Sequence, residues 1–200
     1  MIRLRAIAVP LLLAGLTAAC DPVTLAVGAG ASVGVAASEE RGVEGAADDL
    51  KIRTEINDLW FRHDYQMFQD VTLTVNEGRV MLTGNVKTPE NHVDAVRLAW
   101  QAAGVRQVID EIKVSDNSSV SDYARDVYIA NNLRSRLMFD KNIQNVNYTV
   151  DVVNGVVYLM GIAQNNDELD RVVAHARDIS NVRRVVSHVL LKNDPARQKP

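Results

Sequence analysis

An internal repeat constrains the fold of this chain more than any other feature of its sequence. Residues 71–86 read VTLTVNEGRVMLTGNV, and residues 148–163, at an offset of 77, read YTVDVVNGVVYLMGIA. The two segments are identical at six aligned positions: Thr72/Thr149, Val75/Val152, Gly78/Gly155, Val80/Val157, Leu82/Leu159 and Gly84/Gly161. Apolar and polar residues alternate along each copy, which is typical of half-buried β-strands. A chain of 200 residues with this repeat predicts two small domains of one fold.

A tight turn in the middle of each copy indicates a β-hairpin. Asn154-Gly155 readily adopts positive φ at both central positions of a two-residue turn, and Glu77-Gly78 is its weaker counterpart. Gly84 and Gly161 lie near the end of the second strand, where a glycine permits positive φ or the close approach of another backbone. We therefore assign a structural role to both of these glycines.

Helical patterns flank each hairpin. In the first copy a helix capped by Asp48 or Asp49 precedes the hairpin, with apolar residues at helical spacing: Ile52, Ile56, Leu59 and Trp60. A second helix begins at Thr88-Pro89-Glu90, which combines a hydroxyl cap, an N-terminal proline and an acidic first turn. Gly104 ends this helix, and an alternating third strand follows. The second copy repeats this order, with Asn165 in the capping position of Thr88.

The predicted fold class is α+β, with two tandem αββαβ domains. Each domain has a three-stranded sheet with two helices on one face, and the pattern leaves the direction of the third strand open. We place the domains at residues 48–115 and 121–192, followed by a flexible tail at residues 193–200. Domains of this size bury only about 60% of their unfolded surface and are marginal alone, so we expect the two copies to be in contact.

The N-terminus resembles a bacterial lipoprotein signal. Arg3 and Arg5 precede a short apolar run, which ends in small residues directly before Cys20, the only cysteine of the chain. In such signals this cysteine is acylated and becomes the first mature residue. We predict a signal peptide at residues 1–19 and lipid attachment at Cys20. The alternative is an ordinary secretory signal with cleavage nearby. In either case a lone cysteine forms no internal disulfide.

Residues 20–47 are predicted to carry the lipid and to form a flexible Gly/Ala tether. Their GxGxxxG pattern from Gly28 to Gly34 could also be interpreted as a phosphate-binding loop. No strand pattern precedes it and no helix pattern follows it, which favours the tether. We therefore predict no cofactor.

Two short motifs resemble a known domain family. Val80-Met81-Leu82-Thr83-Gly84 and Val157-Tyr158-Leu159-Met160-Gly161 share a V-x-L-x-G run that ends the second strand, and the segments starting at Gly104 and Asn181 support the likeness. The αββαβ unit with this run is similar to the BON domain of bacterial envelope proteins, over residues 49–192. Two such domains behind a lipoprotein signal resemble dual-BON-domain lipoproteins.

This resemblance implies a non-enzymatic protein that supports envelope integrity and binds anionic phospholipid, mainly through the first helix of the second domain. It also implies a lipid-anchored protein facing the periplasm, at the outer membrane. Asp21, however, resembles an inner-membrane retention signal, so the inner membrane is the alternative.

The first helix of the second copy contains the predicted lipid-binding residues. Ile129, Leu133 and Leu137 are expected to point inward, and four other residues suit a lipid headgroup boundary: Tyr128, Arg134, Arg136 and Met138. In the first copy Asn57 occupies the place of Arg134, and the next residue is an acid. The alternative interpretation is an ordinary solvated helix face.

Other chemistry is weakly indicated. The histidines His63, His92, His175 and His188 show no spacing that suggests a metal site, and no serine lies in a nucleophile motif. We predict no catalytic residue and no metal.

The net charge bears on the choice of partner. Without Arg3 and Arg5, the chain has 20 of its 22 Lys and Arg residues against 25 acidic residues, which argues against nucleic acid as a partner. The main alternative function is an envelope adaptor that binds another protein through a free sheet edge or the groove between the copies, and a hydrolase or metal enzyme ranks third.

Overall fold

The computed structural model describes residues 34–115 and 120–197. Cys20 and residues 198–200 lie outside this range. The first domain contains α2 (Gly42–His63), a short α3 (Tyr65–Asp70), β1 (Val71–Asn76), β2 (Arg79–Val86), α4 (Pro89–Ala99) and β3 (Gln107–Val114). The second contains α5 (Val120–Phe139), a 3-10 turn (Asn145–Asn147), β4 (Tyr148–Val153), β5 (Val156–Ala163), α6 (Asn166–Arg177), β6 (Arg184–Leu191) and a last 3-10 turn (Pro195–Arg197). The predicted αββαβ order is confirmed in both copies, with one unpredicted short element before the first strand of each: α3 in the first copy and the 3-10 turn in the second.

Both domains have the same sheet topology. The strand orders are β1-β2-β3 and β4-β5-β6, so the second strand of each hairpin is central. The hairpin strands are antiparallel, whereas β2 pairs with β3, and β5 with β6, in parallel. The parallel pairing, which the sequence left open, follows from the crossover helix that returns the chain to the start of the sheet.

The caps of the crossover helices are as predicted. The Thr88 side chain accepts a hydrogen bond from the N–H of Asn91, and the Asn165 side chain accepts one from the N–H of Glu168. Each residue thereby satisfies an N–H group that has no partner within its helix.

The predicted start of the first helix was wrong, because α2 begins at Gly42, ahead of Asp48 and Asp49. Asp49 is instead buried within the helix, and its carboxylate accepts hydrogen bonds of 2.9 Å from the N–H groups of both Glu77 and Gly78. Asp126 of α5 does the same for Asn154 and Gly155, at 2.6 and 2.7 Å. Turn N–H groups lack a partner in the strand ladder, so each first helix caps the hairpin turn of its own domain.

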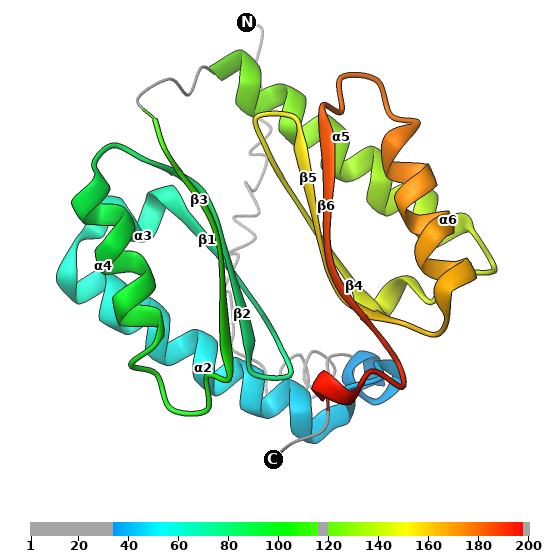
Figure 1. The fold of residues 1–200 in the computed structure, drawn as a ribbon, viewed down its shortest axis with the longest axis horizontal. Helices are drawn as coiled ribbons and strands as arrows, with labels where there is room; N and C mark the ends of the chain where they lie inside the picture. The colour runs from blue at the N-terminus through cyan, green and yellow to red at the C-terminus, as the bar shows by residue number, and fades with distance from the viewer. Residues whose placement is uncertain (1–33, 116–119, 198–200) are drawn as a thin grey trace, which may run out of the picture.

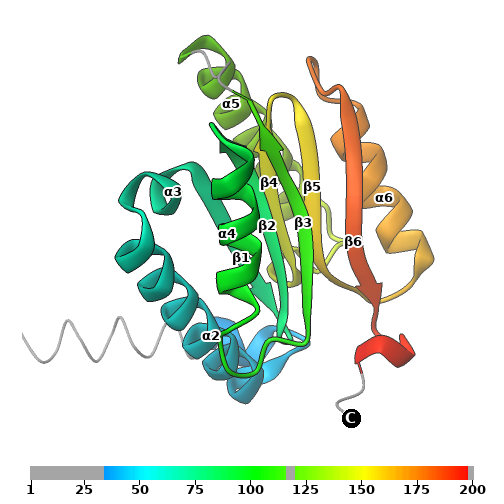
Figure 2. The same cartoon turned by 60° about the vertical axis from the view of Figure 1, so that its left-hand side comes forward.

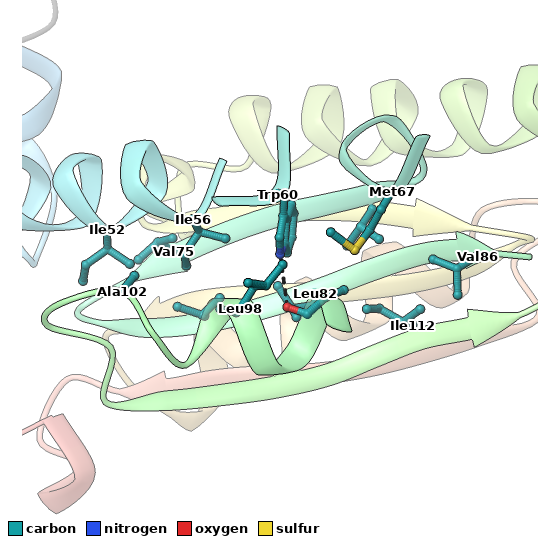
Figure 3. Packing of buried hydrophobic residues seen from close by; sticks show 14 residues of the cluster. Ile52, Ile56, Trp60, Met67, Val75, Leu82, Val86, Leu98, Ala102 and Ile112 are labelled. Carbon is teal, nitrogen blue, oxygen red and sulfur yellow. Dashed lines mark hydrogen bonds between the residues drawn. The ribbon is translucent and has the colours of Figure 1, made fainter. Parts of the chain in front are cut away.

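One hydrophobic core fills each domain between its sheet and its helices. In the first domain, α2 and α4 cover the same face of the sheet (Figure 1). Trp60 is fully buried at the centre of that core, and its Nε1 donates a hydrogen bond of 3.1 Å to the carbonyl of Ala95 in α4 (Figure 3). In the second domain the predicted inward residues Ile129, Leu133 and Leu137 are buried in the corresponding core.

The opposite faces of the two sheets pack against each other, which confirms the expected contact between the copies. The result is a sandwich of helices, sheet, sheet and helices (Figures 1 and 2). A small third cluster lies between the sheets, formed by Met81, Ile109, Tyr158 and Met160 with Val153, Val156 and Val186 around it. Polar contacts surround this cluster, namely Thr83 with Asp151, Asn154 with Asn85 at 3.1 Å and His188 with Glu111 at 2.9 Å.

Both ends of the described chain contact the other domain. Glu40, ahead of α2, forms an ion pair of 3.1 Å with Lys192 and accepts a hydrogen bond from Gln164. Arg197, after β6, forms an ion pair of 2.8 Å with Glu77 of the first hairpin. Glu40 lies in the segment predicted as a flexible tether and Arg197 in the predicted tail, so the ordered part extends further at both ends. The ion pairs of Glu40 and Arg197 across the domain interface are the physical reason why these two segments pack against the domains.

Candidate membrane-binding surface

The outward face of α5 presents apolar side chains. Tyr128 and Met138 are both more than half exposed, on the side of the helix opposite the buried residues Ile129 and Leu133. The structure adds Phe139, which is 77% exposed at the last position of the helix. Sequence reasoning missed Phe139, although its spacing of eleven residues from Tyr128 places both on one stripe of an α-helix.

Arg134 lies on one flank of this face. Its side chain donates a hydrogen bond of 2.6 Å from Nη2 to the carbonyl oxygen of Val150 in β4, an outer strand of its sheet. Arg134 is exposed, and a guanidinium has five donors, so this bond orients the group and leaves donors for a phosphate.

Arg136 lies on the other flank and faces α6. Its guanidinium forms an ion pair of 2.6 Å with Asp178 and a hydrogen bond of 2.8 Å with Asn132. The same contact holds the pKa of the Asp178 carboxyl below its usual value. The structure therefore separates the two predicted arginines. Arg136 already has a carboxylate partner, whereas among the described residues no carboxylate forms an ion pair with Arg134.

Arg134 and the exposed Met138 both line a hollow of about 480 Å³. It lies between α5 and the β4 edge, and Met138, Leu137, Tyr148 and Val150 form its apolar lining. Burial raises the pKa of Tyr148, so its hydroxyl stays neutral. Arg134 is then the one charged side chain among the residues that line the hollow. The hollow therefore combines a positive group with apolar surface, which suits a phosphate headgroup and the start of an acyl chain.

The histidines have structural partners instead of metal geometry. Each forms a pair with one carboxylate: His63 with Asp94, His92 with Asp110, His175 with Asp140 and His188 with Glu111, at 2.6–2.9 Å. Within residues 34–115 and 120–197, no group of three His, Cys, Asp or Glu side chains could hold a metal ion. Across these same residues no helix is both long enough and apolar enough to cross a membrane.

The repeated αββαβ unit, with a glycine in its central strand, defines a class of small α+β domains. Comparison with family models matches residues 48–116 and 125–193 to the BON domain. The chain therefore belongs to the BON domain family and contains two copies in tandem.

Several known proteins are similar to this chain over most of its length. An "uncharacterized protein in gshII 5'region" of Anaplasma centrale is 39% identical over 152 residues, covering 76% of this chain and 99% of that protein. The osmotically-inducible protein Y of Escherichia coli is 26% identical, covering 72% of this chain and 73% of that protein. The outer membrane lipoprotein DolP of Haemophilus influenzae is 25% identical, covering 82% and 85%. Among solved structures, the type III secretion protein CdsD of Chlamydia trachomatis matches with 18% identity and a TM-score of 0.30, over 69% of this chain and 90% of that one.

Proposed function

We propose that this protein is a non-enzymatic, lipid-anchored periplasmic protein that binds anionic phospholipid through α5 and supports the integrity of the cell envelope. The observation that carries the proposal is the outward face of α5. There, Tyr128, Met138 and Phe139 are exposed beside Arg134, whose guanidinium is the one charge in the adjoining hollow. Apolar side chains with a nearby arginine match the two components of an anionic bilayer surface.

The proposed anchor is the acylated Cys20, which lies 14 residues before the described chain begins at Gly34. Fourteen residues span at most about 50 Å when fully extended, so the anchor would hold Gly34 within about this distance of the bilayer. The likeness to an outer membrane lipoprotein supports placement at the outer membrane. Asp21 keeps the inner membrane as the alternative.

Vesicle binding by the mature chain without its lipid tests the α5 site. Arg134→Glu is compared with Lys51→Glu, an exposed basic residue of α2 at the repeat position of Tyr128. Each basic residue near an anionic surface contributes about 1 kcal/mol, so reversing Arg134 should weaken binding by about tenfold or more at low salt. Lys51→Glu should have a much smaller effect. Equal loss from both variants, or binding that ignores salt, would remove α5 as the lipid site.

An envelope adaptor is the second candidate, favoured by one observation. β6 is an outer strand, and among its residues Val185–Leu191 the one ionisable side chain is His188. Such an edge can accept an added strand from another protein. The groove between the copies is a weaker adaptor site, because the two sheets already pack against each other there. Loss of partner capture in a Ser187→Lys variant, which adds a charge at an exposed position of β6, with vesicle binding unchanged, would support the adaptor.

A further inference from the structure

A cluster of three aromatic rings lies on the surface of the first domain, where α2 meets α3. We call Phe61, Tyr65 and Phe68 the aromatic cluster. The ring centroids of Phe61 lie 5.7 Å from those of both Tyr65 and Phe68, and Tyr65 and Phe68 stack at 6.4 Å. Phe61 is 56% exposed and Tyr65 57% exposed, while Phe68 packs against the core. Two large rings therefore face outward although the core beneath them is already complete.

The backbone holds the aromatic cluster in one arrangement. The Asp64 carboxylate accepts hydrogen bonds from the N–H groups of Gln66 and Met67, at 2.7 and 3.3 Å, and so caps α3 directly after α2 ends. Met67 and Trp60, the chain neighbours of Phe68 and Phe61, are fully buried and fix both helices to the core (Figure 3). Rings that are already ordered lose little conformational entropy when they bind.

Several charged side chains near the aromatic cluster form ion pairs within the protein. Asp58 pairs with Arg62 at 2.9 Å, and Asp94 pairs with both His63 and Arg97. The Tyr65 hydroxyl accepts a hydrogen bond of 3.0 Å from Gln69 and supplies a polar tip beside the two phenylalanines. An apolar body with a polar tip suits the boundary between headgroups and acyl chains.

The end of α3, which follows the aromatic cluster in the chain, and part of α5 line one hollow. This hollow has a volume of about 370 Å³, and its lining includes Gln69 and Asp70 of α3 and Tyr123 and Val127 of α5. Gln69, the chain neighbour of Phe68, lies on one side of this hollow, and the exposed Tyr123 of α5 lies on the other.

We propose that the aromatic cluster is a second lipid contact, which enters the interfacial layer of the same bilayer that α5 binds. This inference rests on the function proposed above for α5. Cys20 supports the bilayer as the occupant, because the predicted anchor lies 14 residues before Gly34 and holds the first domain within about 50 Å of the membrane. The two contacts differ in chemistry. Arg134 requires anionic lipid, whereas the aromatic cluster carries no net charge, so its contribution persists at high salt.

Vesicle binding separates the two contacts. Phe61→Ser/Tyr65→Ser is compared with Val93→Ser/Trp100→Ser, which removes similarly exposed apolar side chains from α4 and its C-terminal end. The probes are vesicles of phosphatidylethanolamine with phosphatidylglycerol, at low and high salt. All variants are made in the mature chain without its lipid. We expect the cluster variant to bind about tenfold more weakly at both salt concentrations, and the control variant to bind as the parent does.

Tryptophan quenching by brominated lipid reports insertion directly. Tyr65→Trp and Tyr128→Trp are each made in a Trp100→Phe background, in which the buried Trp60 is the remaining tryptophan of the chain. Quenching of both variants is the expected result. Quenching of Tyr128→Trp alone, with normal binding by the cluster variant, overturns this inference and leaves the α5 proposal intact.

Each remaining outcome supports or contradicts one of the two proposed lipid contacts. Quenching of Tyr65→Trp alone supports the aromatic cluster as a lipid contact and overturns the α5 proposal. Quenching of neither variant overturns both. If Phe61→Ser/Tyr65→Ser instead changes the sedimentation of the protein without vesicles, the cluster is a surface for self-association and the inference is wrong.

Discussion

Gly84 and Gly161 occupy places where no side chain fits. Their φ angles are +128° and +141°, in a region that L-residues rarely adopt. A Cβ atom at Gly84 would overlap the carbonyl oxygen of Asp70, and one at Gly161 would overlap that of Asn147. Both glycines therefore allow the central strand to pass the chain segment that leads into the first strand of its sheet.

We expect Gly84→Ala and Gly161→Ala each to lower the free energy of unfolding by about 3 kcal/mol or more, since backbone strain and steric overlap add. Urea denaturation of the whole chain measures the effect. Gly34→Ala is the control, because no atom lies within 4 Å of its Cβ position. Unchanged denaturation of both variants would show that the surrounding backbone adjusts freely.

At the scale of elements, histidine–carboxylate pairs connect helices to neighbouring segments. Asp140, directly after α5, bonds His175 of α6 at 2.9 Å. Its pKa is held below the usual value, first by His175 and then by the N–H of Asn142. A carboxyl whose folded pKa is lowered contributes stability above its unfolded pKa of about 3.9, and this contribution is lost as the pH falls through the folded pKa.

Stability should therefore decline as the pH falls below about 4, with Asp94 and Asp178 contributing in the same direction. Asp140→Asn should be less stable than the parent at neutral pH, and its stability should fall less steeply in acid. Urea denaturation from neutral to acidic pH tests both points. Parallel curves for parent and variant would exclude Asp140 as a source of the pH dependence.

The central strands β2 and β5 differ at their first residue, which faces the opposite domain. Arg79 begins β2 at the repeat position of Val156, is only 7% exposed and has no hydrogen-bond partner for Nη1 in the described part of the chain. Its Nε donates a hydrogen bond to Gln107 at 3.0 Å, and burial lowers its pKa. An incompletely paired buried charge weakens this end of the interface.

Replacing Arg79 by methionine should raise the free energy of unfolding by about 1 kcal/mol, because it removes the desolvated charge and keeps much of the volume. Arg79→Lys retains a charge and should not stabilise the protein. Thermal unfolding of the two variants makes the comparison. A methionine variant less stable than the parent would show that nearby carboxylates compensate the buried guanidinium.

At the scale of the whole molecule, the attachment to the membrane depends on Cys20. We expect Cys20→Ala to release the protein from membranes into the soluble envelope fraction, because acyl chains contribute about 0.8 kcal/mol per buried CH₂ and the proposed surface contacts are weaker. Fractionation measures the release. Intact mass of the mature parent protein should show acyl groups, and their absence would contradict the anchor.

The sequence by itself predicted the repeated unit, its element order, the caps at Thr88 and Asn165 and the inward residues of α5. These features depend on local patterns, namely strand and helix periodicity and turn and cap chemistry, which a few neighbouring residues specify. It also predicted the exposed positions of Tyr128 and Met138, since helix geometry determines which residues share a face.

Only the tertiary structure decided the features that join distant residues. Asp49 and Asp126 cap turns 28 residues further along the chain, and Arg136 faces Asp178 across two helices. The parallel third strands, the packing of sheet on sheet and the hollow between the end of α3 and α5 likewise follow from how complete elements meet. Such contacts depend on the orientation of packed elements in space, and no local pattern specifies that orientation.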